Sequence, residues 1–217
     1  MSFEAREEWV QLCRTWETDK ENYYWLYPKV LCPFRDKKLK ILEVGVHHGG
    51  SLLLFDDYFH DVEIYGLDID TTKCKEGKWK EDIERNSRIK LLKGNQSDIG
   101  VLHDLQKQFG PFDIIIDDGS HFVEDIVSTF EFFKSKFNLL YIIEDTCLTL
   151  TGSHYEITGD HNIEWMKDLC HNNNTSLIQD RYFYERYWAE QIRHLDENRS
   201  PLYSIRFFGN AICIERT

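Results

Sequence analysis

The sequence lacks several features that would assign a protein class at once. Its 217 residues contain no apolar run long enough to cross a bilayer. Basic residues are scarce, because 26 Lys and Arg face 38 Asp and Glu, which gives a formal net charge of −12 at pH 7. Nucleic acids and anionic membranes both attract cationic surfaces, so this charge argues against either as the main partner.

The cysteines are equally uninformative about metal or redox chemistry. All six stand singly, without the CxxC pairs that zinc sites and thioredoxin-type centres use. The first ten residues, MSFEAREEWV, are acidic and amphipathic, unlike a signal peptide. We therefore expect reduced, buried thiols and a cytoplasmic location.

Short apolar runs alternate with helical periodicity through most of the chain. Strands are predicted over 40–46, 62–70, 88–94, 112–118 and 139–145. Helices are predicted over 3–16, 51–59, 99–109 and 122–133, and 18–28 reads as a short helix or a structured loop. Near the end, Gly209-Asn210 separates two β-rich runs and predicts a hairpin.

This order of elements predicts an α/β fold. Its centre would be a doubly wound, mostly parallel, seven-stranded Rossmann-like sheet with a C-terminal antiparallel hairpin, the arrangement typical of class I methyltransferases. We expect one domain over 1–217. Within it, residues 1–38 would form an N-terminal helical cap, and 147–200, polar and poor in strand signals, an insertion on the substrate side. The aromatic residues of 182–188 in this insertion could pack on a sugar or simply form helix core.

The loop after the first strand is a candidate cofactor site. It reads ExGxxxGG over 43–50, which differs from the dinucleotide fingerprint GxGxxG. A carboxylate inside the strand suits a cationic ligand without phosphate, such as S-adenosylmethionine, and a helix N-terminus follows the glycines. The candidate contacts in this segment are Glu43, Gly45, Gly49 and Ser51.

Polar side chains also follow the second, third and fourth strands. Asp68, or else Asp70, lies about 20 residues past the glycine loop, where a carboxylate can accept hydrogen bonds from ribose hydroxyls. Asn95 and Gln96 could read an adenine edge, and Asp117 joins this set of candidate cofactor contacts. Each residue alone could be a turn residue or a helix cap, but their succession favours a nucleoside-containing cofactor.

A second group of residues indicates metal-assisted chemistry. Asp118, Glu144 and Asp145 follow two strands and offer the hard oxygen ligands that Mg²⁺ and Mn²⁺ prefer. Adjacent residues of a strand face opposite sides, so Glu144 and Asp145 can share an ion only if the strand has ended. His121 is the candidate general base for a hydroxyl proton, although it could instead be a helix-start cap or a buried histidine.

These segments carry a family resemblance. EVGVHHGGS, GLDID, GNQSD, IIIDDGSH and IIEDT, in this order over about residues 15–146, resemble the metal-dependent sugar O-methyltransferases of macrolide biosynthesis. This is the mycinamicin VI 2''-O-methyltransferase, macrocin O-methyltransferase and cephalosporin hydroxylase-like group. The resemblance implies a metal held by Asp118, Glu144 and Asp145 and a base at His121. It also places Thr18-Asp19-Lys20 near the active site.

The resemblance implies an S-adenosylmethionine-dependent O-methyltransferase. The acceptor would be a sugar hydroxyl of a small-molecule glycoside or a glycan, a deoxyhexose such as rhamnose being plausible, and Mg²⁺ or Mn²⁺ would assist. Two alternatives stay open: a metal-dependent catechol or phenol O-methyltransferase, and a non-catalytic module that binds S-adenosylmethionine. No nucleic-acid or membrane partner is expected, and a homo-oligomer is left open.

Overall fold

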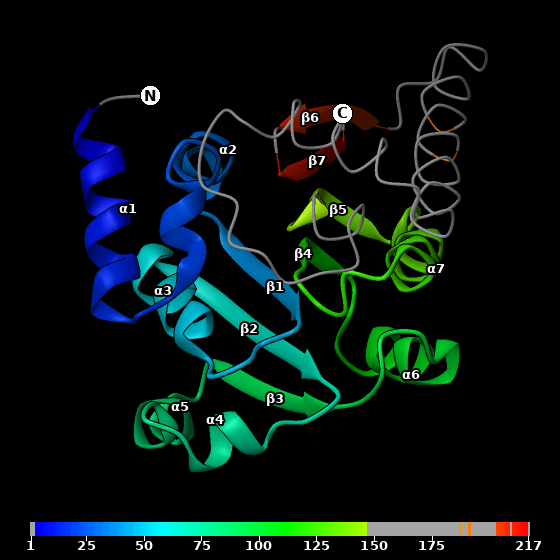
Figure 1. Ribbon diagram of the computed structural model, residues 1–217, viewed down its shortest axis with the longest axis horizontal. Helices are drawn as coiled ribbons and strands as arrows, with labels where there is room; N and C mark the ends of the chain where they lie inside the picture. Colours follow the sequence, from blue (N-terminus) through cyan, green and yellow to red (C-terminus); the bar gives the residue numbers. More distant parts are fainter. Residues whose placement is uncertain (1–2, 147–186, 188–190, 192–202, 209, 217) are drawn as a thin grey trace, which may run out of the picture.

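One seven-stranded sheet forms the centre of the computed structural model, which describes residues 3–146, 187, 191, 203–208 and 210–216. The strands lie in the order β3-β2-β1-β4-β5-β7-β6 (Figure 1). They are β1 (Lys38–Val44), β2 (Asp61–Asp68), β3 (Ile89–Lys93), β4 (Phe112–Asp117), β5 (Phe137–Ile143), β6 (Tyr203–Phe208) and β7 (Ala211–Arg216).

The strand directions confirm the predicted fold class. β1 to β5 are parallel to one another, whereas β7 is antiparallel to β5, and β6 is antiparallel to β7. The chain builds outward from β1 to β3 and then returns to add β4 on the other side of β1. This reversal creates a switch point between β1 and β4, where open α/β sheets bind their ligands.

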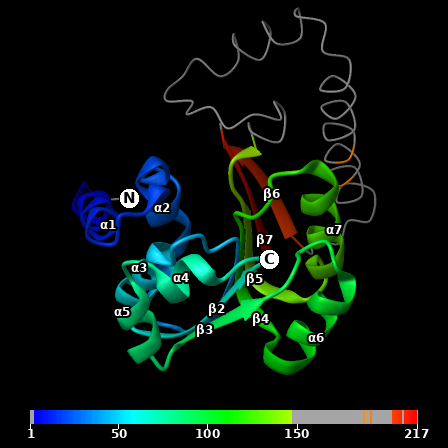
Figure 2. The same cartoon turned by 60° about the horizontal axis from the view of Figure 1, so that its bottom comes forward.

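Helices cover both faces of the sheet. Figure 2 shows α1, α2 and α3 on one face and α6 and α7 on the other. The helices are α1 (Phe3–Thr15), α2 (Tyr27–Leu31), α3 (Gly50–Tyr58), α4 (Thr72–Glu76), α5 (Lys80–Arg85), α6 (Ile99–Phe109) and α7 (Val123–Phe133), with the 3-10 turns η1 (Asp19–Tyr23) and η2 (Cys32–Phe34).

The apolar runs form strands because both of their faces are buried. Ile114 and Ile116 of β4 point into the core under α1 and α3, and Ile115 points into the core under α6 and α7. The N-terminal helices belong to the first of these cores. Trp9 is fully buried and stacks on Tyr27 with ring centroids 5.0 Å apart. The segment 1–38 predicted as a helical cap therefore contributes core residues in its described part.

The structure differs from the sequence prediction mainly between β2 and β3. This connection contains α4 and α5, which the sequence analysis did not predict. Each has one buried residue, Cys74 and Ile83, so neither shows an amphipathic period. The predicted insertion over 147–200 lies outside the described residues, apart from Tyr187 and Gln191. Among the helices that are described, none is long and apolar enough to span a membrane.

Candidate active site

The strand register brings the predicted metal residues to one edge of the sheet. Val44 at the end of β1 pairs with Asp117 of β4, and Asp117 pairs with Ile143 of β5. The next residues in each chain segment therefore lie at the same level, beside the switch point. Asp118 follows β4, and Glu144 and Asp145 follow β5.

Asp118, His121 and Asp145 converge on one point. The Nε2 atom of His121 lies 3.9 Å from Asp118 Oδ1 and 3.9 Å from Asp145 Oδ2. One ligand atom of each residue lies within 4.8 Å of the others, and all three side chains are partly exposed. These separations are too long for direct hydrogen bonds. The two 3.9 Å separations are short enough for one ion to bridge, because two atoms each about 2.1 Å from Mg²⁺ lie at most about 4.2 Å apart.

The backbone at this point is strained. His121 has φ 59° and Asp145 has φ 51°, in the left-handed region that residues with a Cβ rarely adopt. Such conformations persist where surrounding contacts enforce them, often at functional sites. Because β5 ends at Ile143 and the chain then turns at Asp145, Glu144 and Asp145 do not simply alternate across the sheet.

Lys20 lies at the centre of three carboxylates. Its Nζ atom is 2.6 Å from Asp118 Oδ2, 2.6 Å from Glu144 Oε1 and 3.4 Å from Glu43 Oε1. The side chain is fully buried, which alone would lower its pKa, but the attraction of Asp118 and Glu144 outweighs this and holds the pKa well above its usual value. The ammonium form of Lys20 is therefore favoured inside the site.

The predicted ligand Glu144 is engaged differently from the other two carboxylates. Its Oε1 atom accepts a hydrogen bond from the Tyr27 hydroxyl in addition to the Lys20 contact. The side chain is only 1% exposed, and it is not part of the group formed by Asp118, His121 and Asp145. The structure thus brings together two of the three predicted metal ligands with the predicted base, and it holds Glu144 beside Lys20.

Several predicted cofactor residues are buried and bonded to protein. Glu43 is fully buried, with its Oε2 accepting a hydrogen bond from Ser51 Oγ at 2.6 Å. Asp117 is 1% exposed and accepts hydrogen bonds from Gln96 Nε2 and the Tyr141 hydroxyl. The Gln96 amide oxygen accepts from the Ser120 backbone N–H. Within the protein, the hydrogen bonds of Glu43, Ser51, Asp117 and Gln96 hold the loops of this edge in place.

The other predicted cofactor residues lie nearer the surface. The half-buried Asp68 uses its Oδ2 to accept hydrogen bonds from the backbone N–H groups of Val46 and His47, so it fastens the loop after β1. Asp70 and Asn95 are exposed at the ends of β2 and β3. Gly49 is buried and precedes α3 with φ 85°.

Gly45 allows the loop after β1 to pack against the metal-site loop. Its φ of 82° favours glycine, and a Cβ atom there would lie 2.0 Å from the Asp118 carbonyl oxygen. This close approach places the first loop directly beside Asp118. The two loops predicted to bind cofactor and metal are therefore one packed unit.

Three residues of the site were not predicted from the sequence, and a fourth was predicted only by resemblance. Tyr23 and Tyr27 come from the aromatic segment before β1, Asn210 from the hairpin turn, and Lys20 was noted only through the family motif. The four-residue spacing of the two tyrosines was the only local signal for them. Asn210 had none, because it reaches Asp145 from 65 residues away.

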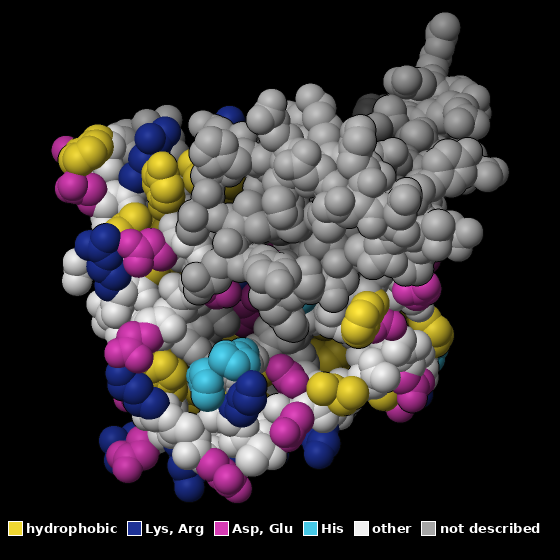
Figure 3. Space-filling model, viewed as in Figure 1, with side chains coloured by type: hydrophobic (Ala, Val, Ile, Leu, Met, Phe, Trp, Pro, Cys, Tyr) yellow, Lys and Arg dark blue, Asp and Glu magenta, His cyan; other side chains and the backbone are white. Residues whose placement is uncertain are grey.

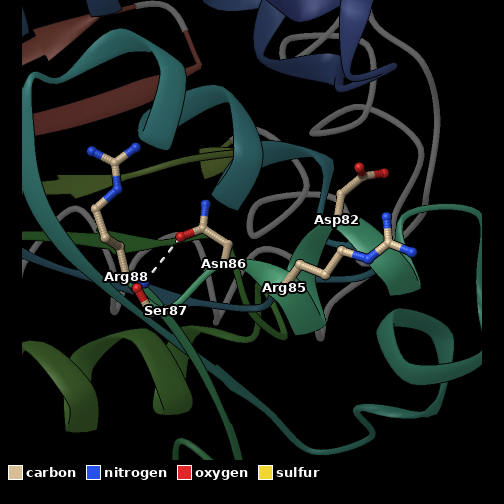
Figure 4. A pocket seen from close by; sticks show the side chains of 5 residues that line it. All are labelled: Asp82, Arg85, Asn86, Ser87 and Arg88. Carbon is tan, nitrogen blue, oxygen red and sulfur yellow. Dashed lines mark hydrogen bonds between the residues drawn. The ribbon is translucent and has the colours of Figure 1, made fainter.

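Elsewhere on the described surface there is less evidence of a functional site. A depression is lined by Asp82, Arg85, Asn86, Ser87 and Arg88 (Figure 4). These residues precede β3, whereas the site lies where the strands end. The lining residues include a turn in which the Arg88 backbone N–H donates a hydrogen bond to Asn86 Oδ1. Figure 3 shows acidic and basic side chains interspersed over the described part of one face.

Comparisons with known proteins find relatives that are named as O-methyltransferases. No protein-family model matches the chain. It is 36% identical over 128 residues to demethylmacrocin O-methyltransferase of Streptomyces fradiae, and 35% identical over 129 residues to mycinamicin VI 2''-O-methyltransferase of Micromonospora griseorubida. Each match covers 55% of this chain and 30% of the relative, so the matched segment is less than a third of those proteins.

A solved structure extends the comparison to the whole sheet. The MycE methyltransferase from the mycinamycin biosynthetic pathway, in complex with Mg, SAH and mycinamycin VI, superposes with a TM-score of 0.69 at 23% identity, over 96% of this chain and 54% of that one. The fold is that of a class I methyltransferase. Within this methyltransferase fold, the loops after β1, β2 and β3 and the group around His121 lie on a single edge of the sheet.

Proposed function

We propose that this chain is an S-adenosylmethionine-dependent O-methyltransferase that acts on a sugar hydroxyl with the help of a divalent cation. The observation that carries the proposal is the convergence of Asp118, His121 and Asp145 at the switch point of a methyltransferase fold. The similarity to sugar O-methyltransferases supports the acceptor class.

The residues present fit both groups. Asp118 and Asp145 each offer a carboxylate oxygen, the type of ligand that Mg²⁺ and Mn²⁺ prefer, and these oxygens lie within 4.8 Å of each other beside the imidazole of His121. At the same edge, Asp68 is half-buried and Asp70 and Asn95 are exposed, where they can meet ribose hydroxyls and an adenine edge. We assign the ion to Asp118 and Asp145, with Glu144 as the further family-implied ligand.

The chain's own residues would position and deprotonate the acceptor. When bound, S-adenosylmethionine supplies the methyl group, and a divalent ion lowers the pKa of the acceptor hydroxyl. His121 Nε2 takes the hydroxyl proton, because it lies beside both carboxylates and is partly open to solvent. Lys20 offsets the charge of Asp118 and Glu144 and keeps the site from being purely anionic. The protein would further accelerate the reaction by holding the methyl group and the acceptor oxygen in line.

The first prediction separates the base from the ligands. His121→Ala should lose at least 100-fold in methyl transfer to a rhamnoside, since general-base help is worth about 10²–10⁴-fold, while S-adenosylhomocysteine affinity changes little. EDTA should abolish turnover, and Asp118→Asn should fail similarly. His103→Ala, which changes an exposed histidine of α6, is the matched control.

Each result has a defined meaning. Full turnover in EDTA would remove the cation from the proposal, and full activity of Asp118→Asn would remove that ligand. If His121→Ala loses Mn²⁺ affinity as well as turnover, His121 is a ligand and not the base. If a catechol is methylated faster than any glycoside, the acceptor is a phenol and not a sugar. If the chain binds the cofactor but transfers no methyl group, it is a binding module and not an enzyme.

A further inference from the structure

Asp145 is held by two segments that are distant in the sequence. The Tyr23 hydroxyl of η1 donates to Asp145 Oδ1 at 2.6 Å, and the same hydroxyl oxygen accepts the Asp145 backbone N–H at 3.0 Å. The Asn210 amide, in the turn between β6 and β7, donates to Asp145 Oδ1 at 2.7 Å and to the Tyr23 hydroxyl oxygen at 2.9 Å. These three residues form a closed triangle of hydrogen bonds.

The triangle occupies one oxygen of the carboxylate and leaves the other directed to the site. Oδ1 of Asp145 receives both side-chain donors, whereas Oδ2 lies 3.9 Å from His121 Nε2. Asp118 shows the same division, because Lys20 takes Oδ2 and Oδ1 faces His121. In both carboxylates the protein binds one oxygen and presents the second.

The triangle also holds the strained backbone. Asp145 has φ 51°, and its N–H group is bound by Tyr23, which is 4% exposed and packed edge-on against Tyr27 at 6.1 Å. The next residue is fastened too, because Thr146 N–H donates to the Asn210 carbonyl oxygen at 3.2 Å. Two segments that do not belong to the parallel sheet thus fix the turn after β5.

We propose that Tyr23 and Asn210 are positioning residues that orient Asp145 for the divalent cation. The inference rests on the proposed function, which assigns Asp145 as a ligand. Partners that hold the second oxygen or ring nitrogen of a metal ligand commonly contribute 10- to 100-fold to metal affinity. Because both residues are bonded to Asp145, we expect their removal to weaken cation binding first.

The test compares Tyr23→Phe and Asn210→Ala with a matched control in the full chain. Tyr65→Phe removes another buried tyrosine's hydrogen bond to a carboxylate, the 2.8 Å bond to Glu63 on β2, away from the site. The readouts are the Mn²⁺ dissociation constant by electron paramagnetic resonance, S-adenosylhomocysteine affinity without added cation, and the melting temperature. We expect Mn²⁺ binding about tenfold weaker or more in Tyr23→Phe, several-fold weaker in Asn210→Ala, and unchanged in Tyr65→Phe.

The outcomes separate this inference from the function beneath it. Mn²⁺ affinity within twofold of wild type in both site variants would overturn the positioning role while leaving the proposed methyltransferase intact. Equal weakening in Tyr65→Phe would overturn it too, since general loosening of the fold would then explain the effect. If the wild-type chain binds no Mn²⁺, the cation is removed from the proposed function, and the positioning role of Tyr23 and Asn210 is overturned as well. If Tyr23→Phe does not fold, the Mn²⁺ affinity of Asn210→Ala alone tests the positioning role.

Discussion

Lys20 shows how one residue can compensate several charges. Its ammonium group contacts Glu43 of β1, Asp118 after β4 and Glu144 after β5, so a residue before the sheet joins three of its strand ends. The Tyr27 hydroxyl adds a fourth connection through Glu144, and burial raises the pKa of Tyr27 well above its usual value, so that it stays a donor. Removing the ammonium would leave buried carboxylates without their counter-charge.

Lys20→Met should therefore destabilise the chain strongly. Removing one partner of a buried ion pair typically costs about 3–5 kcal/mol, and here three carboxylates lose the same partner. The check is urea denaturation without added cation. Lys29→Met, at an exposed position of α2, should change the free energy of unfolding by less than about 0.5 kcal/mol. Equal stability of the two variants would contradict the compensating role of Lys20.

At the level of elements, the loops that follow the strands determine the site more than the strands themselves do. β1, β4 and β5 bring their ends to one edge, but the loops after them must approach each other closely for Asp118 to meet the first loop. Gly45 permits this contact because it has no Cβ atom and adopts φ 82°.

Gly45→Ala should push these two loops apart. The added carbon would lie 2.0 Å from the Asp118 carbonyl oxygen, and the left-handed backbone disfavours alanine, so we expect a loss of more than about 2 kcal/mol in stability. Cation affinity should fall with it, because Asp118 moves. Gly100→Ala, in the first turn of α6, should change stability by less than about 1 kcal/mol. Denaturation and Mn²⁺ titration of both variants test this, and a Gly45→Ala protein that behaves like Gly100→Ala would refute it.

At the scale of the whole molecule, the buried carboxylates couple stability to pH. Burial raises the pKa of Glu43 from its usual 4.5 to about 7, although Lys20 and Ser51 act in the opposite direction. The folded state therefore keeps this proton at pH values where the unfolded state has lost it. The contribution of Glu43 to stability falls as the pH rises from about 4.5 to about 7.

Glu43→Gln removes this dependence, because glutamine does not titrate. The free energy of unfolding of Glu43→Gln, minus that of the wild type, should rise by about 3 kcal/mol as the pH increases from about 4.5 to about 7. Above that pH the difference should stay constant. Urea denaturation at pH 5 and pH 8 measures the difference. Glu63→Gln is the contrast, because a hydrogen bond from Tyr65 lowers the pKa of Glu63 and the relative stability of that variant should not rise. A pH-independent difference for Glu43→Gln would contradict the prediction.

The sequence by itself determined the fold class and the edge at which the site lies. Apolar runs such as that in 112–118 are typical of strands buried on both faces, and alternating strands and helices favour a parallel sheet. Since every parallel strand ends at the same edge, Asp118, His121 and Asp145 could be placed near one another from their positions in the chain alone. The hairpin around Gly209-Asn210 followed equally from local turn chemistry.

Only the tertiary structure decided which oxygen atoms face the site. That Glu43 and Glu144 both lie beside Lys20, and that Glu144 stands outside the group of Asp118, His121 and Asp145, depends on contacts between segments that are distant in the sequence. Sequence periodicity reports which face of an element is buried, but it carries no information on which distant partner a buried polar group finds. Burying a polar group without such a partner is costly, so those long-range contacts set the arrangement of the site.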